Sequence, residues 1–202
     1  RSYVIALKNA PDVGGMYLDE AQAGMSFRNY EDLLLVGGGD QRTGKKGGAW
    51  QELRSFARRY YPQADEQYHW AAQDCMSLDG APYIGPYSAS TSGLYVATGF
   101  NKWGMTSSMV SAMILSDLVQ EKEHPFAKVF SPSRSMFRPQ LITNGWEAMV
   151  SLLTPTTRRC PHLGCALKWN SQEHTWDCPC HGSRFEEDGK RIDGPATGDL
   201  KL

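Results

Sequence analysis

The sequence predicts an α+β fold in which a mixed sheet with helices precedes a small, mostly β module. Three observations lead to this prediction. Strand-like apolar runs and helical periodicities alternate irregularly through about the first 130 residues. Residues 155–202 are instead rich in Gly, Pro, Cys and His, a composition typical of a loop-built metal module. Four of the five cysteines fall between residues 160 and 180, and such clustering indicates a metal site.

The elements expected in the first part follow from the spacing of apolar residues. Strands are expected at 1–9, 15–19, 25–30, 32–38, 66–74 and 94–100, the last of them buried. Helices are expected at 49–61, which Pro62 ends, at 104–119 and, as a shorter piece, at 139–153.

Two side-chain predictions accompany these elements. Met105, Met109, Ala112 and Met113 share one face of the helix at 104–119, and we expect that face to pack in a core. Cys75 stands far from the other cysteines in the sequence, and we expect a buried, unreactive thiol.

Composition places the chain among soluble globular proteins and argues against two classes of partner. Of the 202 residues, 41% are hydrophobic and 21% charged, and the formal net charge is −1. A nearly neutral chain offers no electrostatic reason to bind nucleic acid or an anionic membrane. The longest apolar stretch, 109–119, is too short to span a bilayer, and no secretory leader is visible. We therefore expect a cytoplasmic protein without a transmembrane segment.

Two short motifs carry the candidate metal ligands: CPHLGC at 160–165, the first box, and CPCHGS at 178–183, the second box. Cys160 and His162 form a C-x-H pair, and Cys178 and His181 form a C-x2-H pair. Two thiolates and two imidazoles can bind one zinc ion tetrahedrally. The same set can hold a [2Fe-2S] cluster with both cysteines on one iron and both histidines on the other. Spacing alone leaves both possibilities open.

The residues around these ligands resemble the two boxes of Rieske proteins, C-x-H-x-G-C and C-x-x-H-G-S, at every defining position. The resemblance implies a [2Fe-2S] cluster in which Cys160 and Cys178 hold one iron. His162 and His181 then hold the outer, solvent-side iron.

The same resemblance gives the two remaining cysteines of the boxes a role. In the Rieske proteins of respiratory and photosynthetic cytochrome complexes the extra cysteine of each box pairs with the other, which implies a Cys165–Cys180 disulfide. The other possibility is a pair of reduced thiols in a cytosolic protein. One departure stands out: a Rieske domain normally has three strands before its first box, and 149–160 leaves little room for them. Either the module is minimal, or the preceding segment supplies an unusual base.

Four further residues acquire roles from the Rieske resemblance. Ser183 matches the serine that donates to a bridging sulfide. Phe185 stands where high-potential members carry a tyrosine whose hydroxyl reaches a cysteine sulfur, so we expect a lower reduction potential. Gly194 and Pro195, in the sequence GPA, resemble the Pro loop that covers the cluster.

The glycine-rich stretch at 39–45 fits the phosphate-loop pattern G-x4-G-K. Lys46 follows, however, where Mg²⁺ coordination requires Ser or Thr, and two more glycines delay any helix that could hold phosphate. We interpret the stretch as a connecting loop.

Residues 79–108 contain DGAPYIG, a strand, a glycine turn and the start of a helix. This stretch resembles the C-terminal flavin-contacting segment of FAD-dependent oxidases of the D-amino acid oxidase/glycine oxidase superfamily. There the start of the helix faces the flavin, and its dipole favours negative charge on the reduced ring. The residues that would line the flavin by this resemblance are Gly99, Phe100, Trp103, Gly104, Met105 and Thr106.

The superfamily's N-terminal half carries a G-x-G-x-x-G unit for the ADP part of FAD, and no such unit occurs here. We therefore expect the C-terminal part of a larger flavoprotein, which needs the missing half to hold FAD. The predicted domains are an oxidase part at 1–130, a linker with a short helix at 131–154 and a Rieske module at 155–202.

Together the two resemblances imply an iron–sulfur flavoprotein oxidoreductase. An amine or amino acid would reduce FAD, and the cluster would pass single electrons to an acceptor or donor protein. Arg28, Arg42 and Arg54 are candidates for binding a substrate carboxylate, although each also suits a surface charge. The alternative is a non-catalytic Rieske electron carrier or redox sensor on an oxidase-like scaffold.

Overall fold

A computed structural model describes residues 1–21, 24–45, 47–135 and 137–201. The chain forms two compact units, one made of Arg1–Gln73 with Glu147–Leu202 and the other of Asp74–Trp146. This division into two units does not test the predicted domain boundaries, which remain predictions. Lys46, which the phosphate-loop argument used, lies outside the described residues.

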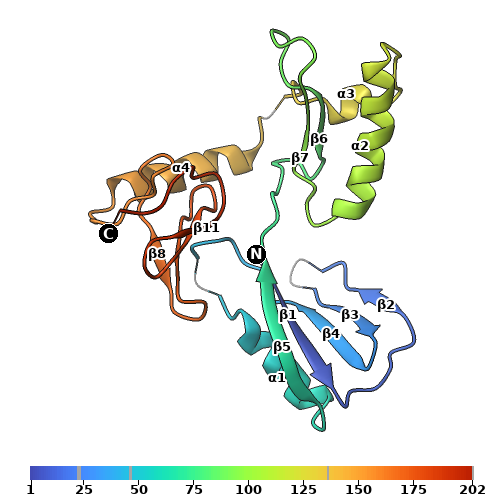
Figure 1. Cartoon of the computed structure of the whole chain (residues 1–202), viewed down its shortest axis with the longest axis vertical. Helices are drawn as coiled ribbons and strands as arrows, with labels where there is room; N and C mark the ends of the chain where they lie inside the picture. The colour runs from blue at the N-terminus through green and yellow to red at the C-terminus, as the bar shows by residue number, and fades with distance from the viewer. Residues whose placement is uncertain (22–23, 46, 136, 202) are drawn as a thin grey trace. The chain divides into compact units, whose positions relative to one another are not determined.

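The first unit begins with an antiparallel sheet covered on one face by a helix (Figure 1). Its strands, in spatial order, are β2 (Met16–Leu18), β3 (Ser26–Tyr30), β4 (Leu33–Gly38), β1 (Ser2–Lys8) and β5 (Asp65–Ala72). Side chains alternate between the two faces of a strand. Ile5 lies opposite Val36, and Leu7 lies opposite Leu34, so that these four line the covered face.

Helix α1 (Trp50–Tyr60) supplies the other half of this core. Trp50, Leu53 and Ala57 are buried, as the apolar periodicity predicts. The Trp50 ring meets Tyr3 edge-on with a centroid separation of 5.0 Å. The G-x4-G-K stretch is not a phosphate loop, because the described residues 47–49 are not helical and α1 begins only at Trp50.

The second unit is a two-stranded sheet packed against helices. Strands β6 (Tyr83–Pro86) and β7 (Tyr95–Thr98) pair antiparallel, and helices α2 (Gly104–Val119) and α3 (Ala127–Phe130) contact β6. Arg134 fixes the segment after α3: its guanidinium donates to both oxygens of Asp79 at 2.7 and 2.8 Å and lies 3.9 Å from the centre of the Tyr83 ring.

Three burial predictions for this unit were wrong. Strand β7 is half-exposed rather than buried, because its sheet has only two strands. The predicted core face of α2 is exposed, with Met105 85% and Met109 67% accessible, and Ala112 and Met113 exposed beside them. The helix instead buries Ser107, Ser111 and Ile114, and it contacts β6. Cys75 is an exposed thiol rather than a buried one.

The Rieske module is a four-stranded antiparallel meander (Figure 1). Its strands are β8 (Lys168–Asn170), β9 (Thr175–Asp177), β10 (Arg184–Glu186) and β11 (Arg191–Asp193). Within the described residues 154–159 no strand precedes the first box; only Arg159 bridges to Ala166. Helix α4 (Pro139–Leu153) supplies the base, because Ser151 O accepts the Ala166 N–H at 3.3 Å.

Candidate metal centre

The two boxes fold into matching turns. In the first box the Cys160 N–H donates to the Cys165 carbonyl at 2.9 Å, and the Gly164 N–H donates back to the Cys160 carbonyl at 2.9 Å. The second box repeats this at the same spacing: the Cys178 N–H donates to Ser183 O at 2.8 Å and the Gly182 N–H to Cys178 O at 3.0 Å. Each turn needs its glycine, because φ is +74° at Gly164 and +82° at Gly182.

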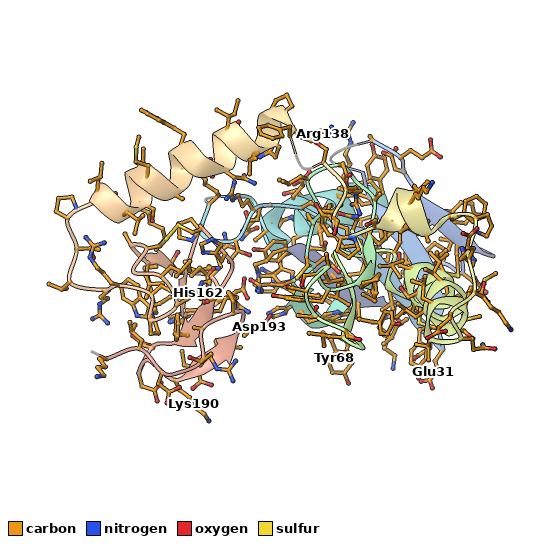
Figure 2. The ribbon with its side chains drawn as sticks, turned by 90° about the horizontal axis from the view of Figure 1, so that it is seen from above. Glu31, Tyr68, Arg138, His162, Lys190 and Asp193 are labelled. Atoms are coloured by element: carbon orange, nitrogen blue, oxygen red, sulfur yellow. A yellow bond between two sulfur atoms is a disulfide. The ribbon has the colours of Figure 1, made fainter. Side chains whose placement is uncertain are left out.

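The four predicted ligands come together as two pairs. The thiols of Cys160 and Cys178 are buried and hydrogen-bonded to each other. The rings of His162 and His181 lie perpendicular with centroids 4.9 Å apart, His181 exposed and His162 half-buried. His162 appears in the side-chain view of Figure 2 on the Rieske module. A buried sulfur pair and a more exposed imidazole pair are the arrangement that the sequence predicts.

Hydrogen bonding between the two sulfurs shifts the pKa values of Cys160 and Cys178 in opposite directions, which favours binding of a cation. The hydrogen bond from Cys178 lowers the pKa of Cys160 to about 5 against the opposing effect of burial, with smaller contributions from the His162 N–H and the Ser183 hydroxyl. The same hydrogen bond and burial raise the pKa of Cys178. Cys160 is therefore the more readily ionised thiol, and a bound metal would displace the proton of Cys178.

The surroundings of His181 favour its ligating, neutral form. Burial, followed by the charges of His162 and Arg42, lowers the pKa of His181. In addition, Nδ1 of His162 is buried and has no hydrogen-bond partner among the described residues. An unpartnered buried nitrogen is costly unless it binds something. The donor set thus fits a [2Fe-2S] cluster.

A single metal ion fits this geometry less well. Among the described residues, the one set of three ligand atoms lying within 4.8 Å of one another belongs to Cys165, Cys178 and Cys180. Two of these sulfurs are joined in the Cys165–Cys180 disulfide, so they are not free to bind a metal. The predicted disulfide is confirmed, and it links the two boxes across a Cα–Cα distance of 6.6 Å. Ligands in two separate pairs suit two irons better than one zinc.

The segment around Gly194 covers the second box. Ser183 is fully buried, and its Oγ accepts the Ala196 N–H at 3.1 Å, which leaves its own proton for another acceptor. Gly194 has φ +95°, and an added Cβ would lie 2.4 Å from the Ser183 Cα. Pro195 is exposed beside it, whereas Phe185 is fully buried in β10.

The predicted flavin residues occupy a tight turn and the start of α2. Phe100, Trp103 and Thr106 line a pocket of about 240 Å³ together with Gly80 and Phe130. Gly99, Gly104 and Met105 do not line it, and Met105 is exposed. The first N–H groups of α2 have no acceptor within the helix, as a site for an electron-rich ring requires.

Sequence reasoning missed the residues that hold this turn. Asn101 and Lys102 have φ of 50° and 70°. The Asn101 side chain accepts the Ser77 N–H at 2.8 Å and donates to the Gly99 carbonyl at 2.7 Å. Asn tolerates the left-handed region better than other non-glycine residues, and its place beside the glycine turn was the available signal.

Two family models match the chain. The model of the DAO family, described as FAD dependent oxidoreductase, matches residues 1–118. The chain belongs to this FAD-dependent oxidoreductase family. A second family model, the Rieske [2Fe-2S] domain, matches residues 152–202. The protein is thus a redox protein with an FAD-dependent oxidoreductase region and a Rieske iron–sulfur domain. No solved structure matches the chain.

Similar proteins fall into two groups. YhfW of Bacillus subtilis, named as a Rieske 2Fe-2S iron-sulfur protein, is 36% identical over all of this chain, which covers 49% of YhfW. The cytochrome b6-f complex iron-sulfur subunits of Synechococcus sp. strain JA-3-3Ab and Nostoc punctiforme are 51% identical over 21% of this chain. The chain covers 25% and 24% of those subunits. It therefore spans about half, or less, of the relatives that it matches.

The helices of the described residues include none long and apolar enough to cross a membrane.

Proposed function

We propose that the protein is an iron–sulfur flavoprotein oxidoreductase that oxidises an amine or amino acid. The observation that carries the proposal is the presence, in one chain, of an FAD-dependent oxidoreductase region and a donor set suited to a Rieske cluster. When bound, FAD supplies two-electron chemistry with the substrate, and the cluster supplies one-electron transfer.

The residues around the proposed cluster have separate roles. Cys160 and Cys178, both buried, would hold the inner iron, and His162 and His181 would hold the outer iron. Ser183 directs its hydroxyl proton toward sulfur, because its oxygen is already occupied by the Ala196 N–H. The exposed side of His181 is where a protein that exchanges electrons with the cluster would dock.

The sheet face opposite α1 supports an amino-acid substrate through the side chains that flank the buried Ala6 and Leu35. Arg28, Leu35, Ala6 and Tyr68 are cross-strand neighbours in one row across β3, β4, β1 and β5. Three strand spacings separate the ends of the row by about 14 Å. Trp70, one pleat along from Tyr68, shares this face and is 42% exposed. This face offers one guanidinium for a carboxylate and, across the sheet, the rings of Tyr68 and Trp70 for the far end of a long side chain.

Of the three candidate arginines, Arg28 is the best placed to bind a carboxylate. Arg54 is committed to both oxygens of Glu66 at 2.7 Å, and Arg42 is committed to Glu147 at 2.7 Å. Arg28 is exposed and makes no hydrogen bond or ion pair with any other described residue.

Anaerobic mixing of the full-length, FAD-loaded protein with a panel of amines and amino acids tests the function. A true substrate bleaches the flavin and then produces the EPR signal of the reduced cluster. Arg28→Gln should raise KM for amino acids but leave simple amines unaffected. Arg58→Gln, which removes an exposed cation from α1, is the matched control.

A non-catalytic electron carrier or redox sensor is the second candidate. It is favoured by the exposed His181 and by the likeness of the module to subunits named as part of the cytochrome b6-f complex. A protein that binds FAD, has a reducible cluster and is reduced by no amine or amino acid would establish this second function against the first.

A further inference from the structure

The glycine-rich loop that follows β4 holds no phosphate-binding helix, yet it contacts the second box. Arg42 Nε donates to the Pro179 carbonyl at 3.2 Å. Gln73, just after β5, donates through Nε2 to the Gly182 carbonyl and to Asp193 Oδ2, each at 3.0 Å. The two carbonyls lie on either side of His181, and Asp193 directly precedes the Gly194 that covers the box.

The loop is shaped to make this contact. Gly44 has φ +75°, and an added Cβ would lie 2.8 Å from backbone atoms of Pro179, so only glycine permits this approach. Thr43 Oγ1 donates to Gln73 Oε1 at 2.8 Å, which orients the amide so that its nitrogen faces the box. The contact therefore has both packing and polar specificity.

Positive charge gathers at the same place. Arg42 and Lys45 both bind Glu147, at 2.7 and 3.0 Å. The Arg42 guanidinium is thus held by Glu147 on the loop that touches the second box. The Arg42 side chain is only 32% exposed, so solvent screens its charge incompletely.

We propose that Arg42 and Gln73, both from the FAD-dependent oxidoreductase region, are positioning residues for the iron–sulfur centre. They clamp the second box at Pro179 and Gly182, and the charge of Arg42 raises the reduction potential of the cluster. The inference rests on the cluster in the proposed function and is independent of the substrate.

The physical reason is the charge that reduction adds. One electron makes the cluster more negative, and a fixed cation beside the ligand loop stabilises that state. Hydrogen bonds to the carbonyls around a ligand fix its orientation, as groups behind metal ligands generally do. Gln73 carries no charge, so it orders the second box without changing the reduction potential of the cluster.

The test is a redox titration of the cluster in the full-length protein, followed by EPR. Arg42→Gln should lower the reduced-to-oxidised ratio at a fixed potential three- to tenfold, where tenfold corresponds to about 59 mV for one electron. Arg42→Lys keeps the charge and should stay within twofold of wild type. Arg58→Gln, with a cation removed elsewhere, should not change the ratio. An Arg42→Gln titration that overlays that of Arg58→Gln would overturn the electrostatic role.

Hydrogen exchange supplies a second readout that needs no titration. In the cluster-loaded protein, Gln73→Leu should speed exchange at residues 178–183 several-fold and leave the potential unchanged, whereas Arg58→Gln should do neither. Wild-type exchange in Gln73→Leu would overturn the clamp. The iron content of the wild-type protein distinguishes failure of the proposed cluster from failure of the proposed clamp. A wild-type protein without iron refutes the cluster. An iron-loaded wild type whose Arg42 and Gln73 variants are unaltered refutes only the clamp.

Discussion

Gly194 occupies a position in which a side chain cannot fit. Its φ of +95° is unfavourable for other residues, and a Cβ would lie 2.4 Å from the Ser183 Cα. We predict that Gly194→Ala destabilises the Rieske module by about 2 kcal/mol or more. Thermal unfolding and iron per chain measure the effect. Gly198→Ala is the matched control, because an added Cβ there meets nothing within 4 Å. Equal stability of the two variants would refute this explanation.

Phe185 is fully buried opposite Trp176, where related high-potential centres carry a tyrosine. Phe185→Tyr adds a hydroxyl that can donate to a cysteine sulfur. A hydrogen bond to a charged group contributes about 1.5 kcal/mol, which for one electron corresponds to a rise of roughly 60 mV in reduction potential. Redox titration measures the rise, with Phe27→Tyr, on the remote strand β3, as the control. A potential that stays constant or falls contradicts the assignment.

Residue identities predicted the metal chemistry better than they predicted burial. The two boxes are recognisable from local sequence, because each is a short turn whose glycine and hydrogen bonds depend only on near neighbours. Burial of Met105 or Cys75 depends on what lies across from them in three dimensions, and hydrophobicity alone does not report it. Gln73 gave no signal at all, since Gly182 and Asp193, to which its amide donates, lie more than 100 residues away in the chain.

At the scale of elements, strands and helices with clear periodicity were predicted well. The spacing in α1 buries one face of the helix, so the pattern survives in the sequence, whereas β1 also buries Ala6 on its other face. The base of the Rieske module was not foreseen in its detail. Helix α4 holds the first box through Ser151 and Ala166, and Arg159 donates to the Leu152 and Gly164 carbonyls at 3.1 and 2.9 Å.

The Asp79–Arg134 pair makes the second unit sensitive to acid. The hydrogen bonds from Arg134 lower the pKa of Asp79 far below its ordinary value. A carboxyl with a depressed folded-state pKa contributes stability that is full above the unfolded pKa, about 3.9, and is lost as the pH falls. We predict that unfolding of this unit becomes easier below about pH 5, and that Asp79→Asn removes most of this dependence. Hydrogen exchange in α2 against pH measures it; an unchanged slope in Asp79→Asn would contradict the role of the pair.

At the scale of the whole molecule, the two hydrophobic cores of the first unit differ in what holds them. The sheet and α1 enclose a core of nine buried residues that contains no cysteine. The buried residues of the Rieske core are Cys160, Cys165, Leu167, Cys178, Phe185, Ala196 and Leu200. Three of these seven described residues are cysteines, of which Cys165 forms the disulfide and Cys160 and Cys178 are the predicted metal ligands, so we expect metal and covalent bonds to replace much of the apolar packing.

This difference predicts selective unfolding when iron is removed. Binding free energy at a site that exists only in the folded state is also folding free energy. Chelation under conditions that keep the Cys165–Cys180 disulfide should therefore increase hydrogen exchange in β8–β11 by at least tenfold, while exchange in β1, β4 and α1 changes by less than threefold.

Subsequent reduction of the disulfide should release the module further, since a 15-residue loop closed by a disulfide contributes about 3 kcal/mol. Cys75→Ser serves as the control for thiol effects, because Cys75 is exposed and unpaired with any other cysteine. If chelation loosens the sheet and α1 as much as the meander, the two cores form one cooperative unit, and the stability of the oxidoreductase region depends on the cluster.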